Sequence, residues 1–435
     1  MENSANPVKK REIFGWAFFD FANSSYVTVV ITAIYSSFFV KYVIPEDHAA
    51  PNSLWSSIIV VGTIIAMLLS PLAGAICDLA GKKKGYLIGA TLICAVSTMG
   101  LYFVDGSTLW LGALLIVVSY VAFMLSETFC ASFLTDIATP KTMGLISGLG
   151  WGIGYFGGLV SLLIVKAVAG GEEGTPAEIV ASHQDAMVAT GLFFAVAALP
   201  TFIWVKERSK PQPGFEAASL SKLASAGVAR MFQTIRMVRK HERLFRFFIA
   251  FLFYSAGVGA AVTFSGIFAR TELKMTTADL ITFFAIIQVL AAVGAMLFGV
   301  LESKRGSKET LIYTLILWAV GTLVIFQIDV LSAALGITPK ELFFIDSALI
   351  GLGLGSVQAC SRTVVGLLTP KEQSAEMFGF WGFASRLSTL LGMLMGPLAD
   401  YLNSLQGAVG LVTVFFIIGI VLLASQDLSG SPEPS

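Results

Sequence analysis

The stretch FGWAFFDFANSSYVTVVITAIYSSFF, residues 14–39, is long and apolar enough to cross a membrane as one helix. A hydrocarbon core of about 30 Å requires about 20 consecutive apolar residues in helical form. This run nevertheless contains a carboxylate, Asp20, and polar side chains one turn later at Asn23 and Ser24. Because an ionisable side chain inside a membrane is costly unless it is paired or faces water, Asp20 is a candidate functional residue.

The composition of the whole chain indicates an integral membrane protein. Of 435 residues, 56% are hydrophobic and 13% are charged, and the mean hydropathy is +0.81. Soluble domains average about 25% charged residues. Continuous apolar runs recur along the chain and are too long for the alternating strands of a membrane barrel. They predict an all-α membrane protein with twelve transmembrane helices at residues 14–40, 54–76, 85–104, 108–134, 143–168, 185–205, 244–269, 279–301, 310–328, 342–367, 376–400 and 407–424.

The distribution of lysine and arginine predicts the orientation, because positive residues stay on the cytoplasmic side during insertion. Counted over alternate loops, 21 of them lie on the side that holds both chain ends and five lie on the other side. The remaining two, Arg362 and Arg386, fall inside predicted spans. The first apolar run lacks a signal-peptide cleavage site. We therefore expect a protein of the bacterial inner membrane with both ends in the cytoplasm.

The chain is built from two similar halves. At an offset of 230 residues, Thr139-Pro140-Lys141 aligns with Thr369-Pro370-Lys371, and Trp151-Gly152 aligns with Trp381-Gly382. The predicted division is a six-helix half at 1–205, a cytoplasmic basic linker at 206–243, a second six-helix half at 244–424 and a disordered cytoplasmic tail at 425–435. Two pseudo-symmetric six-helix halves are typical of secondary transporters.

The linker contains apolar residues at helical spacing with basic residues around them. This pattern predicts an amphipathic helix on the anionic inner leaflet, with a regulatory or partner-binding role as the alternative. The apolar positions are Val228, Met231, Phe232, Ile235 and Val238.

A second repeated motif follows the second predicted helix. GAICDLAGKKK, residues 74–84, has Gly74 for close helix approach, Asp78 near the helix end and Gly81 in the turn. The corresponding stretch GVLESKRGSK, residues 299–308, keeps the glycine spacing but has Ser303 in place of the aspartate, with Glu302 before it. We interpret this second copy as degraded.

These motifs resemble those of the major facilitator superfamily over essentially the whole chain. A closer similarity is to its vacuole effluxer branch, which includes autophagy-related proteins implicated in amino-acid export. The segments that carry it are FFDFANSSY at 18–26, LTDIATPKTMGLISGLGWGIGYFGG at 134–158, GSVQACSRTVVGLLTP at 355–370 and EMFGFWG at 376–382. The chain departs from that branch at Phe19, Phe21 and Thr135, where tyrosine, tryptophan and proline are more common.

The resemblance implies a secondary transporter that works by alternating access, with amino acids or similar small zwitterions as substrates. It also implies a cytoplasmic gate formed by Gly74, Asp78, Gly81 and Lys82, in which Asp78 acts as an inter-helix latch. Asp136 lies at another predicted cytoplasmic helix end and is assigned to the same gate.

Charged side chains inside the predicted spans are the candidates for substrate binding or ion coupling. Asp20, Glu127 and Arg362 are predicted at similar depth, on helices that line the central cavity in the superfamily. We expect Asp20 and Glu127 to couple transport to protons, and Arg362 to bind a substrate carboxylate or to switch partners. A permanent ion pair that holds the halves in register is the alternative. The full candidate set is Asp20, Asn23, Ser24, Glu127, Gln358, Arg362 and Arg386.

Other functions find little support in the sequence. No phosphate-binding loop is present, and the three histidines lie in loops, so we expect no enzyme activity, no cofactor and no metal. The four cysteines are scattered and are expected to be free buried thiols. The predicted partners are a small-molecule substrate, protons as coupling ion and membrane lipids, without nucleic acid, for a monomeric chain. A drug or organic-ion exporter, a sugar symporter and a non-transporting membrane sensor or scaffold are the alternatives.

Overall fold

The computed structural model describes residues 7–45, 48–169, 175–236, 241–402 and 404–428. Within these ranges the regular structure is helical, and no strand occurs. The predicted disordered tail lies outside the described residues from 429 onward. The helices are α1 (Lys10–Tyr26), α2 (Tyr35–Phe38), α3 (Pro51–Ala80), α4 (Lys83–Gly100), α5 (Leu109–Ser132), α6 (Leu134–Ile137), α7 (Met143–Ala169), α8 (Pro176–Ala197), α9 (Leu199–Trp204), α10 (Leu220–Arg236), α11 (Glu242–Thr271), α12 (Thr277–Arg305), α13 (Ser307–Phe326), α14 (Ile328–Leu335), α15 (Pro339–Leu368), α16 (Ser374–Met393), α17 (Met395–Leu402) and α18 (Leu405–Ala424).

Eleven helical segments of the described residues are long and apolar enough to cross a membrane, which confirms the predicted all-α membrane architecture. The first is continuous from Lys10 to Val43 and contains π-helical turns at Val27–Ala33 and Phe39–Val43. The predicted span at 376–400 is not among the eleven. It corresponds to α16 and α17, and the charged residues Glu376 and Arg386 make the 20 residues of α16 less apolar than the other long helices.

The described residues form two compact units that each include a segment from the other half of the sequence. Unit 1 contains residues 1–137, 153–232 and 371–382, and unit 2 contains 138–152, 233–370 and 383–435. We call 138–152 and 371–382 the exchanged segments. Both end at the repeated Trp-Gly pair, so they occupy equivalent positions in the internal repeat. Helices α7 and α16 therefore each run through both units.

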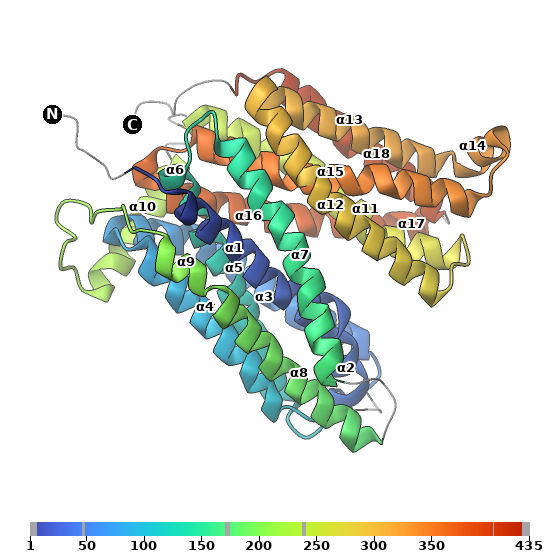
Figure 1. The fold of residues 1–435 in the computed structure, drawn as a ribbon, viewed down its shortest axis with the longest axis horizontal. Coiled ribbons are helices and arrows are strands. Elements are labelled where there is room, and N and C mark those ends of the chain that lie inside the picture. The colour runs from blue at the N-terminus through green and yellow to red at the C-terminus, as the bar shows by residue number, and fades with distance from the viewer. Residues whose placement is uncertain (1–6, 46–47, 170–174, 237–240, 403, 429–435) are drawn as a thin grey trace. The chain divides into compact units, whose positions relative to one another are not determined.

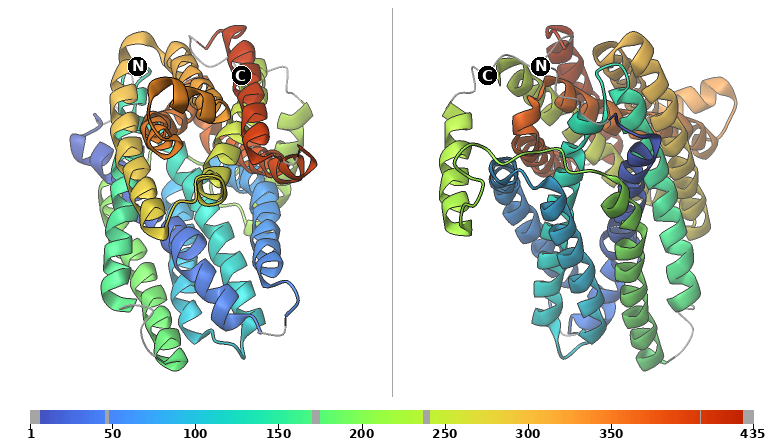
Figure 2. Two further views of the ribbon diagram at one scale, coloured as in Figure 1. Left: turned by 90° about the vertical axis from the view of Figure 1, so that its right-hand side faces the viewer. Right: turned by 60° about the vertical axis from the view of Figure 1, so that its left-hand side comes forward.

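In unit 1, α4 packs against α5 and α8, α3 packs against α5, and α1 packs against α8 and α9 (Figures 1 and 2). Two buried hydrogen bonds fasten α1 to α5. The indole Nε1 of Trp16 donates to the carbonyl oxygen of Cys130 at 2.7 Å, and the hydroxyl of Tyr26 lies 2.8 Å from Ser119 Oγ. Because these contacts are ten residues apart on α1, they hold the two helices together over several turns.

In unit 2, α15 packs against α12 and α13, and α18 packs against α11 and α13 (Figure 1). Two glycines allow α12 and α15 to approach closely. A Cβ atom on Gly355 would lie 1.9 Å from the carbonyl oxygen of Ala291, and one on Gly294 would lie 2.1 Å from that of Leu352. Glycine is thus the residue that fits these two positions, in the way that small residues serve helix contacts in membranes.

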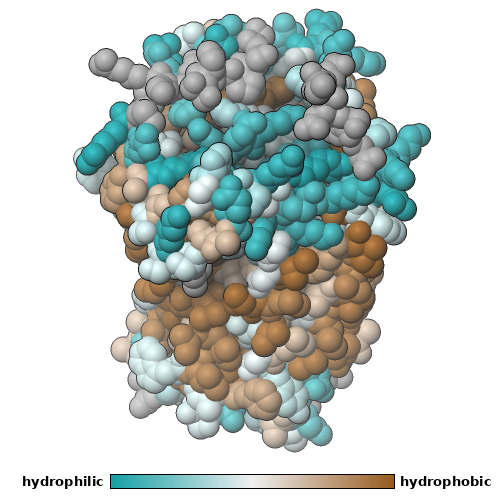
Figure 3. All heavy atoms as spheres, turned by 90° about the vertical axis from the view of Figure 1, so that its left-hand side faces the viewer, coloured by the Kyte–Doolittle hydropathy of each residue, from teal (hydrophilic) through white to brown (hydrophobic). Residues whose placement is uncertain are grey.

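Apolar side chains also cover the outside of the long helices. In unit 1 the exposed ones include Leu92, Ile93 and Val96 on α4 and Leu192 and Val196 on α8. Figure 3 shows one face on which hydrophobic residues gather in a band beside a region of hydrophilic residues. A large exposed apolar band is expected where helices contact lipid hydrocarbon rather than water.

Three long helices begin with a capping box. Thr175, Thr276 and Thr338 accept a hydrogen bond from the third residue of α8, α12 and α15, whose acidic side chain bonds back. At α12 that residue is Asp279, which also pairs with Lys340 at 2.7 Å. The ammonium of Lys340 and the hydrogen bonds from Thr276 lower the pKa of Asp279 to about 2, so this cap stays charged at neutral pH.

Replacing Gly355 with alanine is expected to lower the free energy of unfolding by about 2 kcal/mol, because the added methyl group meets the backbone of α12. Thermal unfolding of the purified protein in detergent measures the effect. Gly89→Ala in α4 is the matched control, since nothing lies within 4 Å of its Cβ position and alanine favours a helix. Equal melting temperatures for the two variants would contradict the close packing of α12 on α15.

Candidate functional site

The motif at residues 74–84 lies at the end of α3 and contacts the start of α16 within unit 1. The carboxylate of Asp78 accepts hydrogen bonds from the backbone N–H groups of Ala375 at 3.1 Å and Glu376 at 2.8 Å. A helix N-terminus carries unsatisfied N–H groups and a partial positive charge, so it is a favourable partner for a carboxylate. We call this contact the unit 1 junction.

Glycines bring the two backbones of the unit 1 junction close together. A Cβ atom on Gly74 would lie 2.1 Å from the carbonyl oxygen of Ala375, and one on Gly379 would lie 2.4 Å from that of Ser70. Gly81 ends α3 with a φ of 61°, which is the left-handed conformation that favours glycine. Gly74 thus lies at a close backbone approach, and Gly81 lies at the turn that ends α3.

A buried lysine of the triplet pairs with Asp136. Lys83 is 1% exposed, and its ammonium lies 2.8 Å from Asp136 Oδ2. Lys82, the lysine assigned to the gate from the sequence, is exposed. Of these two lysines it is thus Lys83 that is buried, because the turn after Gly81 directs the second lysine inward.

Helix α10 of the linker packs along α3 in unit 1. Leu223 contacts Leu79 and Ala80, and Gly227 lies against Ile76. Arg230 reaches the buried carboxylate of Glu376, with Nε 2.7 Å from Oε2. The linker is thereby tied to the same turn of α16 that Asp78 contacts.

The predicted apolar positions of α10 lie mainly on its outer face. Val228, Phe232 and Ile235 are 39%, 52% and 45% exposed, while Val238 lies outside the described residues. The helix thus presents an apolar stripe outward along the end of a membrane-spanning helix.

The exchanged segment 138–152 makes the corresponding contact in unit 2, where the start of α7 packs on α12 and α15. A Cβ atom on Gly148 would lie 2.3 Å from the carbonyl oxygen of Ala295, and one on Gly299 would lie 2.8 Å from that of Gly144. Glu302 is 4% exposed, and its side chain lies directly against Gly144. We call this contact the unit 2 junction. The motif copy read as degraded therefore retains a buried carboxylate, one residue before the position of the missing aspartate.

Arg362 belongs to the unit 2 junction. This 4% exposed side chain donates from Nε to Ser147 Oγ at 3.0 Å and from Nη2 to the carbonyl oxygen of Ser147 at 2.8 Å. Its guanidinium carbon lies 5.5 Å from the ring centre of Trp151, a cation–π distance. Ser147 Oγ in turn donates to the carbonyl oxygen of Ala359. In this arrangement Arg362 holds the exchanged segment against α15.

The candidate residues of helix 1 lie where α1 meets α7 in unit 1. Asp20 is 8% exposed and Asn23 is 6% exposed. A Cβ atom on Gly154 would lie 3.3 Å from Asp20 Cβ, so α7 covers this part of α1. Ser24 Oγ donates to the backbone carbonyl oxygen of Asp20 at 2.7 Å, which satisfies the hydroxyl within the helix.

The remaining candidates are divided between the units. Glu127 is a half-buried residue of α5 in unit 1, and Gln358 and Arg386 are half-buried residues of α15 and α16 in unit 2. A single network that joins the acids of unit 1 to the arginines of unit 2 stays a prediction.

Several ionisable residues of the two junctions are not apparent from the sequence, because they stand in predicted loops or at the ends of predicted helices. Lys83, Glu302 and Glu376 are buried, and Arg230 is half-buried. Asp346 lies inside the predicted span 342–367 and is 2% exposed, with neither carboxyl oxygen hydrogen-bonded to a described residue. It faces Gly321 of α13, where a Cβ atom would lie 3.2 Å from Asp346 Oδ1. A systematic count of charges within the predicted spans would have found it.

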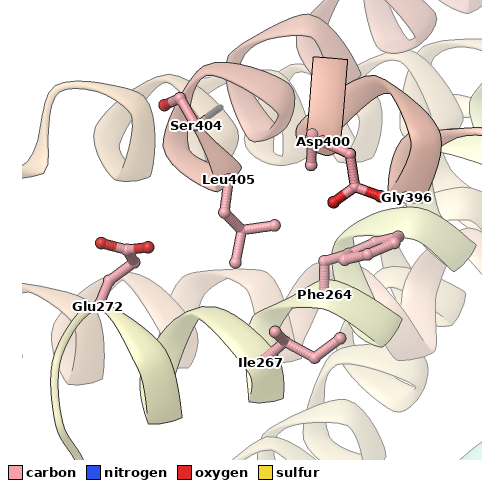
Figure 4. Close-up of a pocket in the computed structure, with 8 residues that line it drawn as sticks. Phe264, Ile267, Glu272, Gly396, Asp400, Ser404 and Leu405 are labelled. Atoms are coloured by element: carbon pink, nitrogen blue, oxygen red, sulfur yellow. The ribbon is translucent and has the colours of Figure 1, made fainter. Parts of the chain in front are cut away.

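A pocket of about 560 Å³ opens in unit 2 beside the ends of α11, α17 and α18. Figure 4 shows the side chains of Glu272, Asp400 and Phe264 on its lining. None of the candidate residues lines it. Among the described residues, no group of three or more His, Cys, Asp or Glu side chains is arranged to hold a metal ion, and the four cysteines are buried free thiols.

Comparison with known proteins identifies the family of this chain. Residues 8–432 match the model of the family described as vacuole effluxer Atg22 like. The chain is 29% identical over 419 residues to the uncharacterized MFS-type transporter YxiO of Bacillus subtilis, covering 94% of this chain and 93% of that protein. It is 23% identical to autophagy-related protein 22 of Kluyveromyces lactis over 65% of this chain and 58% of that protein, so it spans just over half of the yeast relative.

Solved structures of major facilitator proteins share the fold at low sequence identity. A bacterial homologue of the iron transporter ferroportin matches with a TM-score of 0.71 and 12% identity, covering 96% of this chain and 98% of that one. The proton:xylose symporter XylE matches with a TM-score of 0.66 and 13% identity, covering 94% and 93%. The family match and this shared fold show that the chain belongs to the vacuole effluxer Atg22-like family and is a membrane transporter of the major facilitator superfamily rather than an enzyme.

Proposed function

We propose that the protein is a secondary active transporter that moves a small solute by alternating access. The observation that carries the proposal is the reciprocal exchange of 138–152 and 371–382 between the units. Each unit packs around the start of one helix from the other half of the sequence. These contacts lie at the helix ends that carry the lysine-rich motifs. Such contacts are suited to close one end of a transport pathway, because they can form and break while each unit keeps its own core.

In this mechanism the two junctions form the gate. Opening it removes Ala375 and Glu376 from Asp78 in unit 1, and Ser147 and Trp151 from Arg362 in unit 2. Each released group then needs water or a new partner, so the closed and open gates differ by hydrogen bonds that solvent can replace. The predicted switching of partners by Arg362 is supported by its hold on an exchanged segment.

The gate is proposed to face the cytoplasm of a bacterial cell, with both chain ends on that side. The excess of lysine and arginine at these helix ends supports this orientation. Lipid of the inner leaflet is the proposed partner of the exposed stripe Val228, Phe232 and Ile235 on α10. We also propose that the protein is a monomer and that its two halves are residues 1–205 and 244–424.

Amino acids or similar small zwitterions are the proposed substrates. The family membership supports this class, as does a candidate set with carboxylates at Asp20 and Glu127 and guanidinium groups at Arg362 and Arg386, which complement both charges of a zwitterion. The experiments below distinguish an amino-acid transporter from a transporter of drugs, organic ions or sugars. The solved relatives named for xylose and iron carry no argument for this chain beyond the fold.

Stabilisation by ligands tests the substrate class. Purified protein in detergent is heated with amino acids, sugars, organic acids or cationic drugs, and at least one amino acid is expected to raise the melting temperature. A ligand at 100 times its Kd that binds only the folded state adds about 2.7 kcal/mol. Counterflow of the same solute in proteoliposomes then tests transport. If another class stabilises the protein and no zwitterion does, the substrate proposal is wrong, and absence of counterflow for every stabilising ligand favours a sensor or scaffold.

Asp20→Asn tests proton coupling. The variant is expected to lose uptake driven by a pH gradient while it keeps ligand-induced stabilisation and counterflow, because an amide cannot release a proton. Asp185→Asn, which changes an exposed aspartate of α8, is the control and should keep all three. Unchanged pH-driven uptake by Asp20→Asn would remove Asp20 from the coupling mechanism.

Arg230→Gln tests the link between the linker and the unit 1 junction. The substitution removes the guanidinium that balances the buried carboxylate of Glu376, and we expect a loss of about 3 kcal/mol in unfolding free energy. The double variant Arg230→Gln/Glu376→Gln should recover most of this loss. Arg236→Gln changes an exposed arginine of the same helix and is expected to be neutral. An equal loss in the single and double variants would show that the charge pair is not the cause.

A further inference from the structure

Glu302 occupies an enclosed position at the unit 2 junction. Its side chain is packed between the first turn of α7 at Gly144 and the inner part of α15, and only 4% of the residue is exposed. A Cβ atom on Gly144 would lie 2.6 Å from Glu302 Oε2, so the carboxyl group fills the space that a side chain at 144 would need.

Neither oxygen of Glu302 has a hydrogen bond of good geometry to a described group, and the donors within reach are weak, uncharged side chains. Its nearest polar neighbours are Ser307 of α13 and Cys360 and Thr363 of α15, all without formal charge. Asp78 at the unit 1 junction differs in this respect, because two backbone N–H groups donate to it. A carboxylate enclosed among uncharged side chains is disfavoured, whereas the neutral acid is tolerated.

We propose that Glu302 is a proton-binding site that is occupied while the unit 2 junction is packed and that releases its proton when α7 separates from α12 and α15. Separation admits water to the carboxyl group. The ionised form is then solvated and is no longer disfavoured. Because the proton is bound in one state and released in the other, packing of the junction becomes linked to the pH of the solution that enters it. The proton site is inferred from the geometry of unit 2 alone, whereas its role in gating rests on the proposed transport cycle.

The charged groups near Glu302 on its own helix and on α13 lie on the exposed side of the junction, and Arg362 of α15 is a buried cation of the same junction whose guanidinium contacts Ser147 and Trp151 of α7. On its own helix, Lys304 and Arg305 are exposed. On α13, Lys308 is held by the carbonyl oxygens of Ala424 and Gln426. The thiol of Cys360 is the titratable group that α15 turns toward the carboxyl, and α7 contributes Gly144, which has no side chain.

Cys360 provides a reporter for the test, because it is buried beside Glu302 and becomes reachable only when the junction loosens. The reporter protein carries Cys77→Ala, Cys94→Ala and Cys130→Ala, so that Cys360 is the remaining thiol. Its alkylation by N-ethylmaleimide is followed from pH 6 to pH 9 in proteoliposomes, with and without Glu302→Gln. The ratio of the two rates removes the pH dependence of thiol alkylation that both proteins share. An ionised Glu302 beside Cys360 disfavours the thiolate and would slow alkylation, so this direct effect cannot produce a rise of the ratio with pH.

The ratio of the rate with Glu302 to the rate with Glu302→Gln is expected to rise with pH, by up to about tenfold per pH unit where the carboxyl loses its proton. Glutamine imitates the neutral acid and should keep Cys360 protected throughout. Glu309→Gln, an exposed neighbour on α13, is the matched control and should follow the parent. A ratio that stays constant with pH would overturn the proposal.

Thermal unfolding gives a second measurement that needs no reporter cysteine. The melting temperature of Glu302→Gln minus that of the parent should be near zero at pH 5 and should become positive toward pH 9. The sign follows because raising the pH removes a proton that the packed parent junction requires. The same difference at every pH would show that Glu302 has only a packing role. Neither measurement uses a substrate, so a negative result here leaves the transport proposal to be judged by counterflow.

Discussion

The first amide groups of α16, at Ala375 and Glu376, donate to the carboxylate of Asp78 at the end of α3. A helix that starts inside a protein must satisfy its leading N–H groups, and in a low-dielectric environment a carboxylate does so strongly. The contact requires two glycines, Gly74 and Gly379, that let the backbones approach, and the cations of Lys83 and Arg230 lie near the carboxylate of Asp78. Arg230 fastens the linker helix to the same turn of α16.

The two junctions are equivalent in the repeat but differ in their chemistry. In unit 1 a carboxylate receives backbone N–H groups. In unit 2 Glu302 is enclosed among uncharged side chains, and Arg362 holds the exchanged segment through Ser147 and Trp151. Duplication explains why the segments correspond. Divergence of a few side chains then allows one junction to be held by hydrogen bonds and the other to respond to protons.

The sequence predicts the helices and some of the site residues, but it does not predict which neighbouring charged residues are buried. The long apolar runs predict the helices well, because hydrophobic length is a local property of the chain. Local sequence also identifies Asp78 through its glycine neighbours. It does not tell that Lys83 rather than Lys82 is buried, since a turn decides which of adjacent lysines points inward. It fails for Glu302 as well, because comparison with the first motif directs attention to position 303, whereas the buried carboxyl is one residue earlier.

The sequence by itself determined the membrane-spanning helical class and the positions of the glycine-rich motifs at 74–84 and 299–308, because each depends on residues close together in the chain. Only the tertiary structure decided that the repeated segments 138–152 and 371–382 are exchanged between the units, that Arg362 binds Ser147 and that Glu302 is enclosed. These features depend on contacts between residues far apart in the chain. Their energies come from close backbone approach and from burial of charge, which no local pattern records.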